Sequence, residues 1–202
     1  MKVIGLHGKA GVGKDTLADI LVRDHGFVKR GFADPLYEEV SAAFGVETAF
    51  LRNRSNKEVA QPSLAFMHCR DAGFADVMRG KCDAHAWYAA NSPRRVLQLW
   101  GTEYRRAQNE NYWLAKMGAF MWQHEHGQPV GVVIPDCRFE NEARWVIVHG
   151  GGQVIEITRD VPDVAAHSSE KGLPRELISR TVDNNGPLSL LHDVAITAIE
   201  YY

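Results

Sequence analysis

The sequence predicts an α/β fold with a parallel sheet, organised as one domain with an irregular insert. Short continuous apolar runs, such as Lys2–His7 and Val130–Ile134, alternate along the chain with segments whose apolar residues recur at helical spacing. Strands that alternate with helices in this way form parallel sheets covered on both faces. The chain has 202 residues, 45% hydrophobic and 24% charged, which is the size and composition of a globular domain that can bury a full core.

Turn and cap residues mark where several elements begin and end. Gly26 follows an apolar helical pattern, and a glycine at that place commonly ends a helix. Ser92 followed by Pro93 supplies an N-cap and a first helical residue. In order, the expected elements are strand Lys2–His7, helix Thr16–His25, strand Phe27–Phe32, helix Pro35–Phe44, a less regular stretch over residues 46–91, a helix from Pro93 through Trp100, a helix from Trp113 to Gly127, strand Val130–Ile134, helix Glu140–His149, strand Val154–Ile157, a weaker strand Ile178–Val182 and helix Pro187–Glu200.

The charge balance excludes a globally basic nucleic-acid binder, because 23 Lys and Arg residues face 25 Asp and Glu residues, a net charge of −2. Between Arg52 and Arg106, however, ten basic residues face five acidic ones. Fifteen of the 23 basic residues are arginines, which bind phosphate or carboxylate through two parallel hydrogen bonds. The local excess indicates a site for one small anion, with no stable nucleic-acid partner.

Three cysteines, Cys69, Cys82 and Cys137, make an odd number without a paired framework, as is typical of reduced thiols. The first apolar run is too short for a signal peptide, and no later run approaches the roughly 20 residues of a membrane span. We therefore expect a cytoplasmic protein without a membrane partner.

The residues from Gly8 to Lys14 match the pattern G-x-x-x-x-G-K, between an expected strand and an expected helix. Glycines in such a loop let several backbone N–H groups point at one anion, and Lys14 reaches the β- and γ-phosphates. No Asn-Lys-x-Asp motif for guanine is present, which favours ATP as the nucleotide. The expected ATP-binding residues are Gly8, Ala10, Gly11, Val12, Gly13, Lys14, Asp15 and Thr16.

Magnesium ligands are expected beside this loop. Asp15 stands where a Ser or Thr ligand is usual, and Thr16 follows it, so the pattern leaves open which of the two contacts Mg²⁺, directly or through water. Asp136 comes directly after a buried strand, where parallel sheets place their ligands. Arg138 would face the same crevice. The alternative is that Asp136 caps the following helix and Arg138 forms a surface ion pair.

A second basic cluster surrounds Gln98–Glu103, with Arg94 and Arg95 before it and Arg105 and Arg106 after it. Residues 94 and 98 are one helical turn apart, so an arginine that clamps a phosphate can share a face with an amide that reads a base edge. A solvated basic helix face is the alternative interpretation.

Several motifs in order carry a resemblance to a known family. They are the phosphate loop ending in Lys14-Asp15-Thr16, Phe32-Ala33-Asp34-Pro35-Leu36, Lys57-Glu58, Ser92-Pro93-Arg94-Arg95, Gln98-Leu99-Trp100-Gly101-Thr102-Glu103, Trp113, Asp136-x-Arg138-Phe139-x-Asn141-Glu142, His167-Ser168-Ser169-Glu170 and Asn184-Asn185-Gly186. Together they resemble the phage-type deoxynucleoside monophosphate kinases, P-loop enzymes whose motifs span most of the chain.

The resemblance implies ATP- and Mg²⁺-dependent phosphorylation of a deoxynucleoside monophosphate (dNMP) to its diphosphate. It implies a P-loop nucleoside-kinase fold with a five-stranded parallel sheet and helices on both faces. It implies a core over residues 1–45 and 108–202, a monophosphate-binding insert over about 46–107 and a lid over about 159–175. A phage-encoded kinase would work in the host cytoplasm, and a homodimer is left open.

The resemblance also implies roles for individual residues. The catalytic candidates are Lys14, Asp136, Arg138 and Arg159, and Arg175 is a further lid candidate. The dNMP-binding candidates are Asp34, Arg94, Arg95, Gln98, Thr102, Arg106, Trp113 and Arg138. Relatives commonly show Gly-Thr-Glu-Trp-Gly-Arg where this chain has Gly101-Thr102-Glu103-Tyr104-Arg105-Arg106. The stretch from Pro62 to Asn91 is also longer than expected, so the base preference is not carried over.

Two rival enzymatic or binding functions and one metal hypothesis remain open. A dephospho-coenzyme A or other small-metabolite kinase has the same core, and a non-catalytic module would bind nucleotide without turnover. His68, Cys69, Cys82 and His85 could form a four-ligand zinc site in the insert, although only one pair has knuckle-like spacing.

Overall fold

The computed structural model describes residues 1–124, 127, 129–149, 151–161 and 172–200. The chain divides into two compact units. Unit 1 comprises Met1–Phe32 and Leu114–Tyr202, and unit 2 comprises Ala33–Trp113. Unit 2 therefore contains all of the expected monophosphate-binding insert, together with the segment that precedes it.

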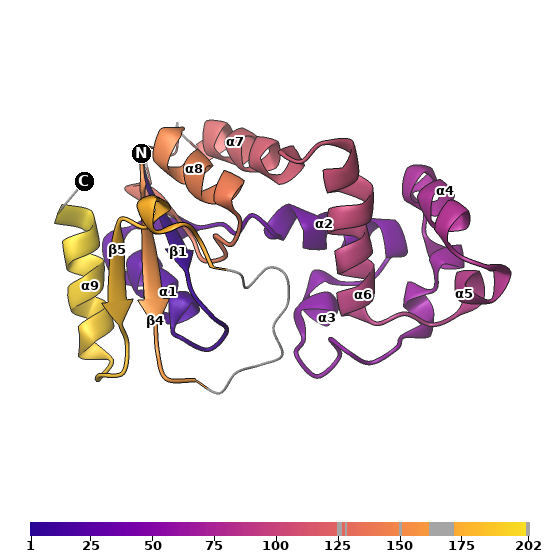
Figure 1. Cartoon of the computed structure of the whole chain (residues 1–202), viewed down its shortest axis with the longest axis horizontal. Helices are drawn as coiled ribbons and strands as arrows, with labels where there is room; N and C mark the ends of the chain where they lie inside the picture. The colour runs from indigo at the N-terminus through magenta and orange to yellow at the C-terminus, as the bar shows by residue number, and fades with distance from the viewer. Residues whose placement is uncertain (125–126, 128, 150, 162–171, 201–202) are drawn as a thin grey trace. The chain divides into compact units, whose positions relative to one another are not determined.

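Unit 1 is built on a five-stranded sheet in the order β2-β3-β1-β4-β5. Strands β1, β4 and β5 are labelled in Figure 1. Every neighbouring pair of strands is parallel. The strands are β1 (Lys2–His7), β2 (Phe27–Lys29), β3 (Gly131–Ile134), β4 (Gln153–Thr158) and β5 (Arg180–Asp183). The α/β prediction is confirmed, and β1 occupies the centre, so the loop that follows it lies at the middle of the carboxyl edge.

Alternate residues of the strands enter two separate cores. Ile4 and Leu6 pack with α1 (Lys14–His25) and α9 (Ser189–Glu200) on one face. Val3 and Ile134 pack on the other face with α7 (Tyr112–His124) and α8 (Glu140–Val148). Burying each such side chain contributes about 1.5–3 kcal/mol to folding. Helices thus cover both faces of the sheet, as the resemblance implies.

Several element boundaries differ by a few residues from the sequence prediction, among them the start of α1 and the end of β2. Helix α1 begins at Lys14 rather than Thr16, directly after Gly13, and ends as predicted at Gly26, whose φ is 70°. Strand β2 ends at Lys29 rather than Phe32. The backbone N–H of Phe32 donates to Oδ1 of Asp136 over 2.7 Å, so this residue leaves the ladder although its side chain is buried.

Unit 2 is helical, and the stretch that looked irregular contains short helices capped by side chains. Asp71 accepts a hydrogen bond from the N–H of Phe74, and Asp83 from that of Ala86. Ser92 caps the next helix as predicted. The elements are α2 (Asp34–Phe44), α3 (Thr48–Arg52), the 3-10 turns η1 (Pro62–Leu64) and η2 (Phe66–His68), α4 (Ala72–Lys81), α5 (Ala84–Tyr88), α6 (Pro93–Gln98) and the π-helix η3 (Leu99–Arg106).

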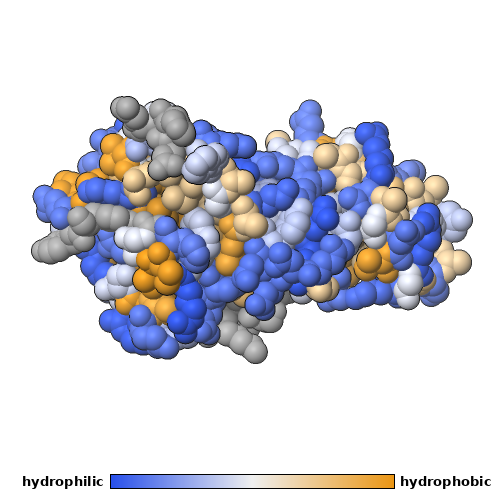
Figure 2. All heavy atoms as spheres, turned by 90° about the horizontal axis from the view of Figure 1, so that it is seen from above, coloured by the Kyte–Doolittle hydropathy of each residue, from blue (hydrophilic) through white to orange (hydrophobic). Residues whose placement is uncertain are grey.

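Aromatic side chains dominate the core of unit 2. Phe74 packs at 4.6 Å, centroid to centroid, from Trp100 and edge-on to Phe66 and Tyr104. On the face drawn in Figure 2, hydrophobic residues appear in separate groups between hydrophilic ones. None of the helices in the described part of the chain is long and apolar enough to cross a membrane.

Candidate active site

The loop between β1 and α1 has three glycines with a left-handed backbone, and at two of them a Cβ would also clash with a neighbouring segment. Gly8 has φ 133° and Gly13 has φ 106°. A Cβ on Gly8 would lie 2.2 Å from the carbonyl oxygen of Ile157, and one on Gly13 would lie 2.5 Å from Nδ2 of Asn184. The loop therefore packs closely on β4 and on the segment after β5, at the N-terminus of α1. Backbone N–H groups in this arrangement form an anion site.

Lys14 lies against this loop. Its Nζ donates to the carbonyl oxygens of Gly8 and Lys9, each over 2.6 Å. The ammonium group is therefore held beside the backbone that would bind a phosphate, which is where the sequence motif places it.

A cavity of about 370 Å³ opens beside the loop, entirely within unit 1. Among the described residues, its lining includes four basic side chains, Lys9, Lys14, Arg138 and Arg159, against one carboxylate, that of Glu156. The structure thus brings together three of the four residues predicted to be catalytic. A concave, positively charged site of this size suits the phosphate groups of a nucleotide.

Asp136, the fourth catalytic candidate, holds the segment after β2. In addition to accepting from the N–H of Phe32, it lies so near Gly31 that a Cβ there would be 2.8 Å from Oδ2. The alternative role as N-cap of the following helix is wrong, because the N-cap residue of α8 is Phe139 and Glu142, at the third helical position, bonds back to it. Oε2 of Glu142 accepts from the N–H of Arg138 and of Phe139 over 2.9 and 3.1 Å. A glutamate at the third helical position was the sequence pattern that could have shown this.

The turn that carries Asp136 and Arg138 is fastened to β1 by His7. The buried His7 ring places Nδ1 2.9 Å from the carbonyl oxygen of Cys137, and because a carbonyl only accepts, Nδ1 is the donor. The N–H of Cys137 donates to the carbonyl oxygen of Leu6 over 3.2 Å. Burial raises the pKa of the Cys137 thiol well above its ordinary range, and the nearby carboxylates of Glu142 and Asp136 add to this, so the thiol stays protonated. His7 was not among the predicted site residues.

Asn184 supports the phosphate loop from the other side. It is buried, and its Nδ2 donates to the carbonyl oxygen of Val12 over 2.8 Å. The next residue, Asn185, accepts through Oδ1 from the N–H of Asp160 over 3.0 Å, beside Arg159. Their position directly after β5, at the carboxyl edge of the sheet, was the feature that could have indicated this role. In the sequence, they stand out only as part of a motif.

The three magnesium candidates offer oxygen donors that are exposed to solvent or that already contact another group of the protein. Oδ1 of Asp15 lies 3.0 Å from Nζ of Lys29, and its side chain is 76% exposed; Thr16 is also exposed. Burial acts to lower the pKa of Lys29, but hydrogen bonds to Asp15 and Asp19 outweigh it and raise that pKa above its ordinary value. Mg²⁺ is commonly held by one or two protein oxygens together with phosphates and water, and this donor set fits that arrangement.

The zinc hypothesis for unit 2 is wrong. Within the described residues, no three side chains of His, Cys, Asp or Glu gather closely enough to hold a metal ion. Cys69 and Cys82 instead pack against the aromatic core, and burial raises the pKa of the Cys69 thiol to about 11. His68 and His85 belong to no such cluster.

The expected lid is only partly within the described residues. Arg159 lines the cavity, whereas residues 162–171, with the motif His167-Ser168-Ser169-Glu170, lie outside them. Arg175, in the 3-10 turn η6 (Arg175–Leu177), donates to Oγ1 of Thr181 over 3.2 Å. Thr181 in turn donates to Glu156 over 2.9 Å, so Arg175 is linked to the carboxylate of the cavity.

The remaining dNMP-binding candidates all lie in unit 2. Asp34 accepts from Nη2 of Arg52 over 2.6 Å, and Arg94 is paired with Glu58. The guanidinium of Arg95 lies 5.9 Å from the centre of the Phe66 ring. Gln98 and Thr102 are exposed, Arg106 is half-buried, and Trp113 is 4% exposed within the aromatic core. Their roles toward a nucleotide stay predictions.

The central strand, the glycine loop and the basic cavity define unit 1 as a P-loop α/β unit of the kind found in nucleotide kinases. No family model matches the chain. Over 90% of its length the chain is 27% identical to the deoxynucleoside-5'-monophosphate kinase of Escherichia phage T5, of which it covers 89%. Over 84% of its length it is 28% identical to a protein of Acanthamoeba polyphaga mimivirus, provisionally named a deoxynucleotide monophosphate kinase, of which it covers 81%. The chain is a homologue of kinase enzymes, and its predicted resemblance to the phage-type deoxynucleoside monophosphate kinases is confirmed.

Proposed function

We propose that this protein transfers the γ-phosphoryl group of ATP to a deoxynucleoside 5'-monophosphate, giving the diphosphate and ADP for DNA precursor synthesis. The observation that carries the proposal is the cavity in unit 1, where Lys14, Arg138 and Arg159 meet beside the phosphate loop. Phosphoryl transfer needs positioning and charge stabilisation more than covalent chemistry, and this cavity supplies both.

On the donor side, the N–H groups of the glycine loop and the N-terminus of α1 would bind the β- and γ-phosphates. Lys14 would exchange its contacts with the carbonyl oxygens of Gly8 and Lys9 for phosphate oxygens. Asn184 would support the loop in its binding conformation through the hydrogen bond to Val12.

In the transfer step, an oxygen of the acceptor phosphate attacks the γ-phosphorus while the bond to the bridging oxygen of ADP breaks. Arg138 and Arg159 would neutralise charge on the transferred group, because both line the cavity that contains Lys14. No side chain has to remove a proton, since the acceptor phosphate is already an anion. His7 and Glu142 hold the backbone from which Arg138 projects.

Mg²⁺ would be held by Asp15 or Thr16, with Asp136 acting directly or through water, and would supply charge neutralisation at the β- and γ-phosphate oxygens. Asp136 also has a contribution of its own, because it keeps the Gly31–Phe32 segment against the end of β3.

For the acceptor side we assign the insert over about residues 46–107 to the dNMP, with Asp34, Arg94, Arg95, Gln98, Thr102, Arg106 and Trp113 as candidate contacts. The lid over about 159–175 would exclude water that could otherwise hydrolyse ATP. The cytoplasm supplies both substrates, and neither a nucleic acid nor a membrane is needed.

A coupled assay of ADP release with Mg·ATP tests this function directly. The panel contains dAMP, dGMP, dCMP, dTMP, their ribonucleotide forms and dephospho-coenzyme A. Turnover with one or more dNMPs is the expected result. Turnover with dephospho-coenzyme A alone would identify a metabolite kinase, and nucleotide binding without turnover under any acceptor would identify a non-catalytic module; either result overturns the proposal.

A further inference from the structure

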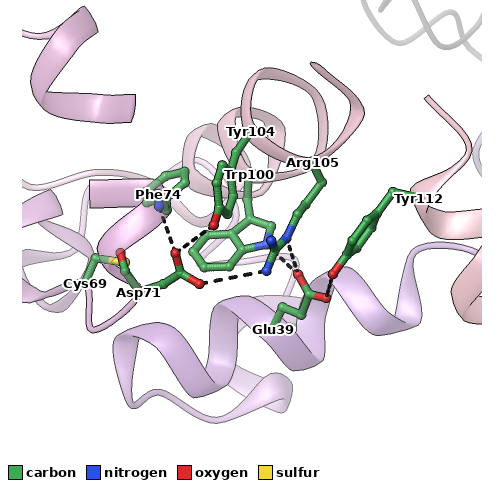
Figure 3. A network of polar contacts seen from close by, with 8 residues as sticks. All are labelled: Glu39, Cys69, Asp71, Phe74, Trp100, Tyr104, Arg105 and Tyr112. Atoms are coloured by element: carbon green, nitrogen blue, oxygen red, sulfur yellow. Dashed lines mark hydrogen bonds and ion pairs between the residues drawn. The ribbon is translucent and has the colours of Figure 1, made fainter. Parts of the chain in front are cut away.

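A half-buried carboxylate organises the interior of unit 2. Glu39, on α2, accepts hydrogen bonds from Nε1 of Trp100 over 2.9 Å, Nε of Arg105 over 2.8 Å and the hydroxyl of Tyr112 over 2.6 Å (Figure 3). Two of these donors come from the π-helix η3 and the third from the start of α7. One carboxylate therefore fixes three aromatic or basic side chains from two other segments.

Arg105 is enclosed on several sides. Its guanidinium lies 4.4 Å from the ring centre of Tyr104 and 4.9 Å from that of Tyr112. Its Nη2 lies 3.8 Å from Oδ2 of Asp71, a second carboxylate, which also accepts from the hydroxyl of Tyr104 over 2.9 Å. The side chains of Glu39 and Arg105 are 16% and 18% exposed. An arginine held in this way, between two carboxylates and against two rings, is committed to the protein and is not a phosphate clamp.

The electrostatics of the pair favour both charges. Burial acts to raise the pKa of Glu39, but the hydrogen bonds from Tyr112, Trp100 and Arg105 outweigh it and hold that pKa below its ordinary value. Burial acts to lower the pKa of Arg105, but the contact with Glu39 outweighs it and raises that pKa. Removal of either charge would leave the other half-buried without its main partner.

The network holds one side of an unusual helix. π-Helices are rare, and their wider i→i+5 turns are frequent at functional sites. Within η3, Trp100 and Tyr104 are buried, whereas Thr102 is exposed. Gln98, Thr102 and Arg106 recur every fourth residue, so they follow a stripe different from that of the network residues.

We propose that Glu39 and Arg105 form a positioning pair that fixes the register of the π-helix and thereby sets the places of Gln98, Thr102 and Arg106 for the dNMP. Neither member of the pair contacts the nucleotide; both act through the helix. This inference rests on the proposed function, because it assigns the stripe to the acceptor nucleotide.

Steady-state kinetics on the full chain test the pair with Glu39→Gln, which keeps the shape of the side chain, and Arg105→Met, which keeps most of its apolar stem. Each should raise KM for the dNMP about tenfold, since a lost charge-assisted hydrogen bond shifts an equilibrium by about that factor. KM for ATP should stay within about twofold, because the phosphate loop belongs to unit 1. The double variant should be no worse than the poorer single variant, as expected when two residues act as one pair.

Lys81→Gln is the matched control. Lys81 forms an exposed ion pair with Glu103 of the same π-helix, and its loss should leave both KM values unchanged. Tyr112→Phe removes a single hydrogen bond to Glu39 and keeps the ring, so it remains informative if the charge variants do not fold. It should raise KM for the dNMP about threefold.

A KM for the dNMP equal to that of the wild type would overturn the pairing. So would a fall in kcat and in thermal stability with both KM values unchanged, which is the result of a purely structural role. Calorimetric titration of the same variants with the dNMP measures the positioning effect without turnover. Wild-type protein that binds a dNMP but never phosphorylates it would overturn the proposed function, while the titration would still decide the role of the pair.

Discussion

In unit 1, the loop and turns that carry the candidate residues are held by hydrogen bonds between side chains and the main chain. His7 donates to the carbonyl oxygen of Cys137, Asn184 to that of Val12, and Asp136 accepts from the N–H of Phe32. In unit 2, the contacts around Glu39 join side chain to side chain. A site built on main-chain contacts depends on strand ends and loops, whereas one built on side-chain contacts depends on the identity of a few residues. We therefore expect the nucleotide triphosphate chemistry to reside in unit 1 and the substrate preference in unit 2.

The largest effect is expected from Lys14→Ala. Loss of the ammonium that reaches the β- and γ-phosphates should reduce phosphoryl transfer on the order of 10³-fold or more, while the fold survives. Circular dichroism and the melting temperature check the fold, and the coupled assay checks transfer. A variant with near wild-type activity would remove the phosphate loop from the mechanism.

The next effect is expected from Gly13→Ala, because the new Cβ would lie 2.5 Å from Nδ2 of Asn184 at a φ of 106°. We expect a destabilisation of about 1–3 kcal/mol in urea unfolding, with weaker ATP binding. Gly80→Ala is the matched control within helix α4, since nothing lies within 4 Å of its Cβ position. It should be neutral or stabilise by about 0.5–1 kcal/mol. Equal effects at the two glycines would contradict the described packing of the loop.

Asn184→Ala should change the kinetic constant of one substrate and leave that of the other nearly unchanged. Without the hydrogen bond to Val12, the phosphate loop loses a buried support, so KM for ATP should rise about tenfold while KM for the dNMP changes little. The variants of Glu39 and Arg105 should show the reverse pattern. If KM for ATP and KM for the dNMP changed together in either set of variants, the two units would not serve the two substrates separately.

The smallest effect concerns acid stability. The pKa of Glu39 lies below its ordinary value of 4.5, so its contribution to the free energy of unfolding is complete above that pH and is lost as the pH falls through the lowered pKa. The difference in urea midpoint between the wild type and Glu39→Gln should therefore shrink between about pH 6 and pH 3. A constant difference across that range would contradict an ionised, hydrogen-bonded carboxylate.

The sequence correctly predicts the parts of the molecule that follow a local pattern. The strands, the glycine loop and the Ser92 cap follow from apolar periodicity and from residues a few positions apart. It failed at Phe32, where an apolar side chain continued the pattern of a strand while Asp136, 104 positions away, took its N–H. Contacts of that kind join residues distant in the chain and leave no periodic trace.

The same reason explains the two larger differences in unit 2. His68, Cys69, Cys82 and His85 have ligand-like chemistry, but sequence spacing alone did not determine whether they gather, and the cysteines pack against an aromatic core instead. Glu39 and Arg105 are separated by 66 positions, and no local pattern in the sequence pairs them. In the sequence Arg105 belongs to a basic cluster, whereas the structure shows an arginine bound to two carboxylates.

The most direct test of the proposed kinase is detection of the reaction product. Wild-type protein is incubated with Mg·ATP and each dNMP in turn, and the nucleotides are separated by anion-exchange chromatography, with Lys14→Ala as the paired control. We expect a deoxynucleoside diphosphate to form in step with ADP for at least one dNMP, and neither product to form with the variant. ADP without any deoxynucleoside diphosphate, or equal product with both proteins, would contradict a kinase that works through this phosphate loop.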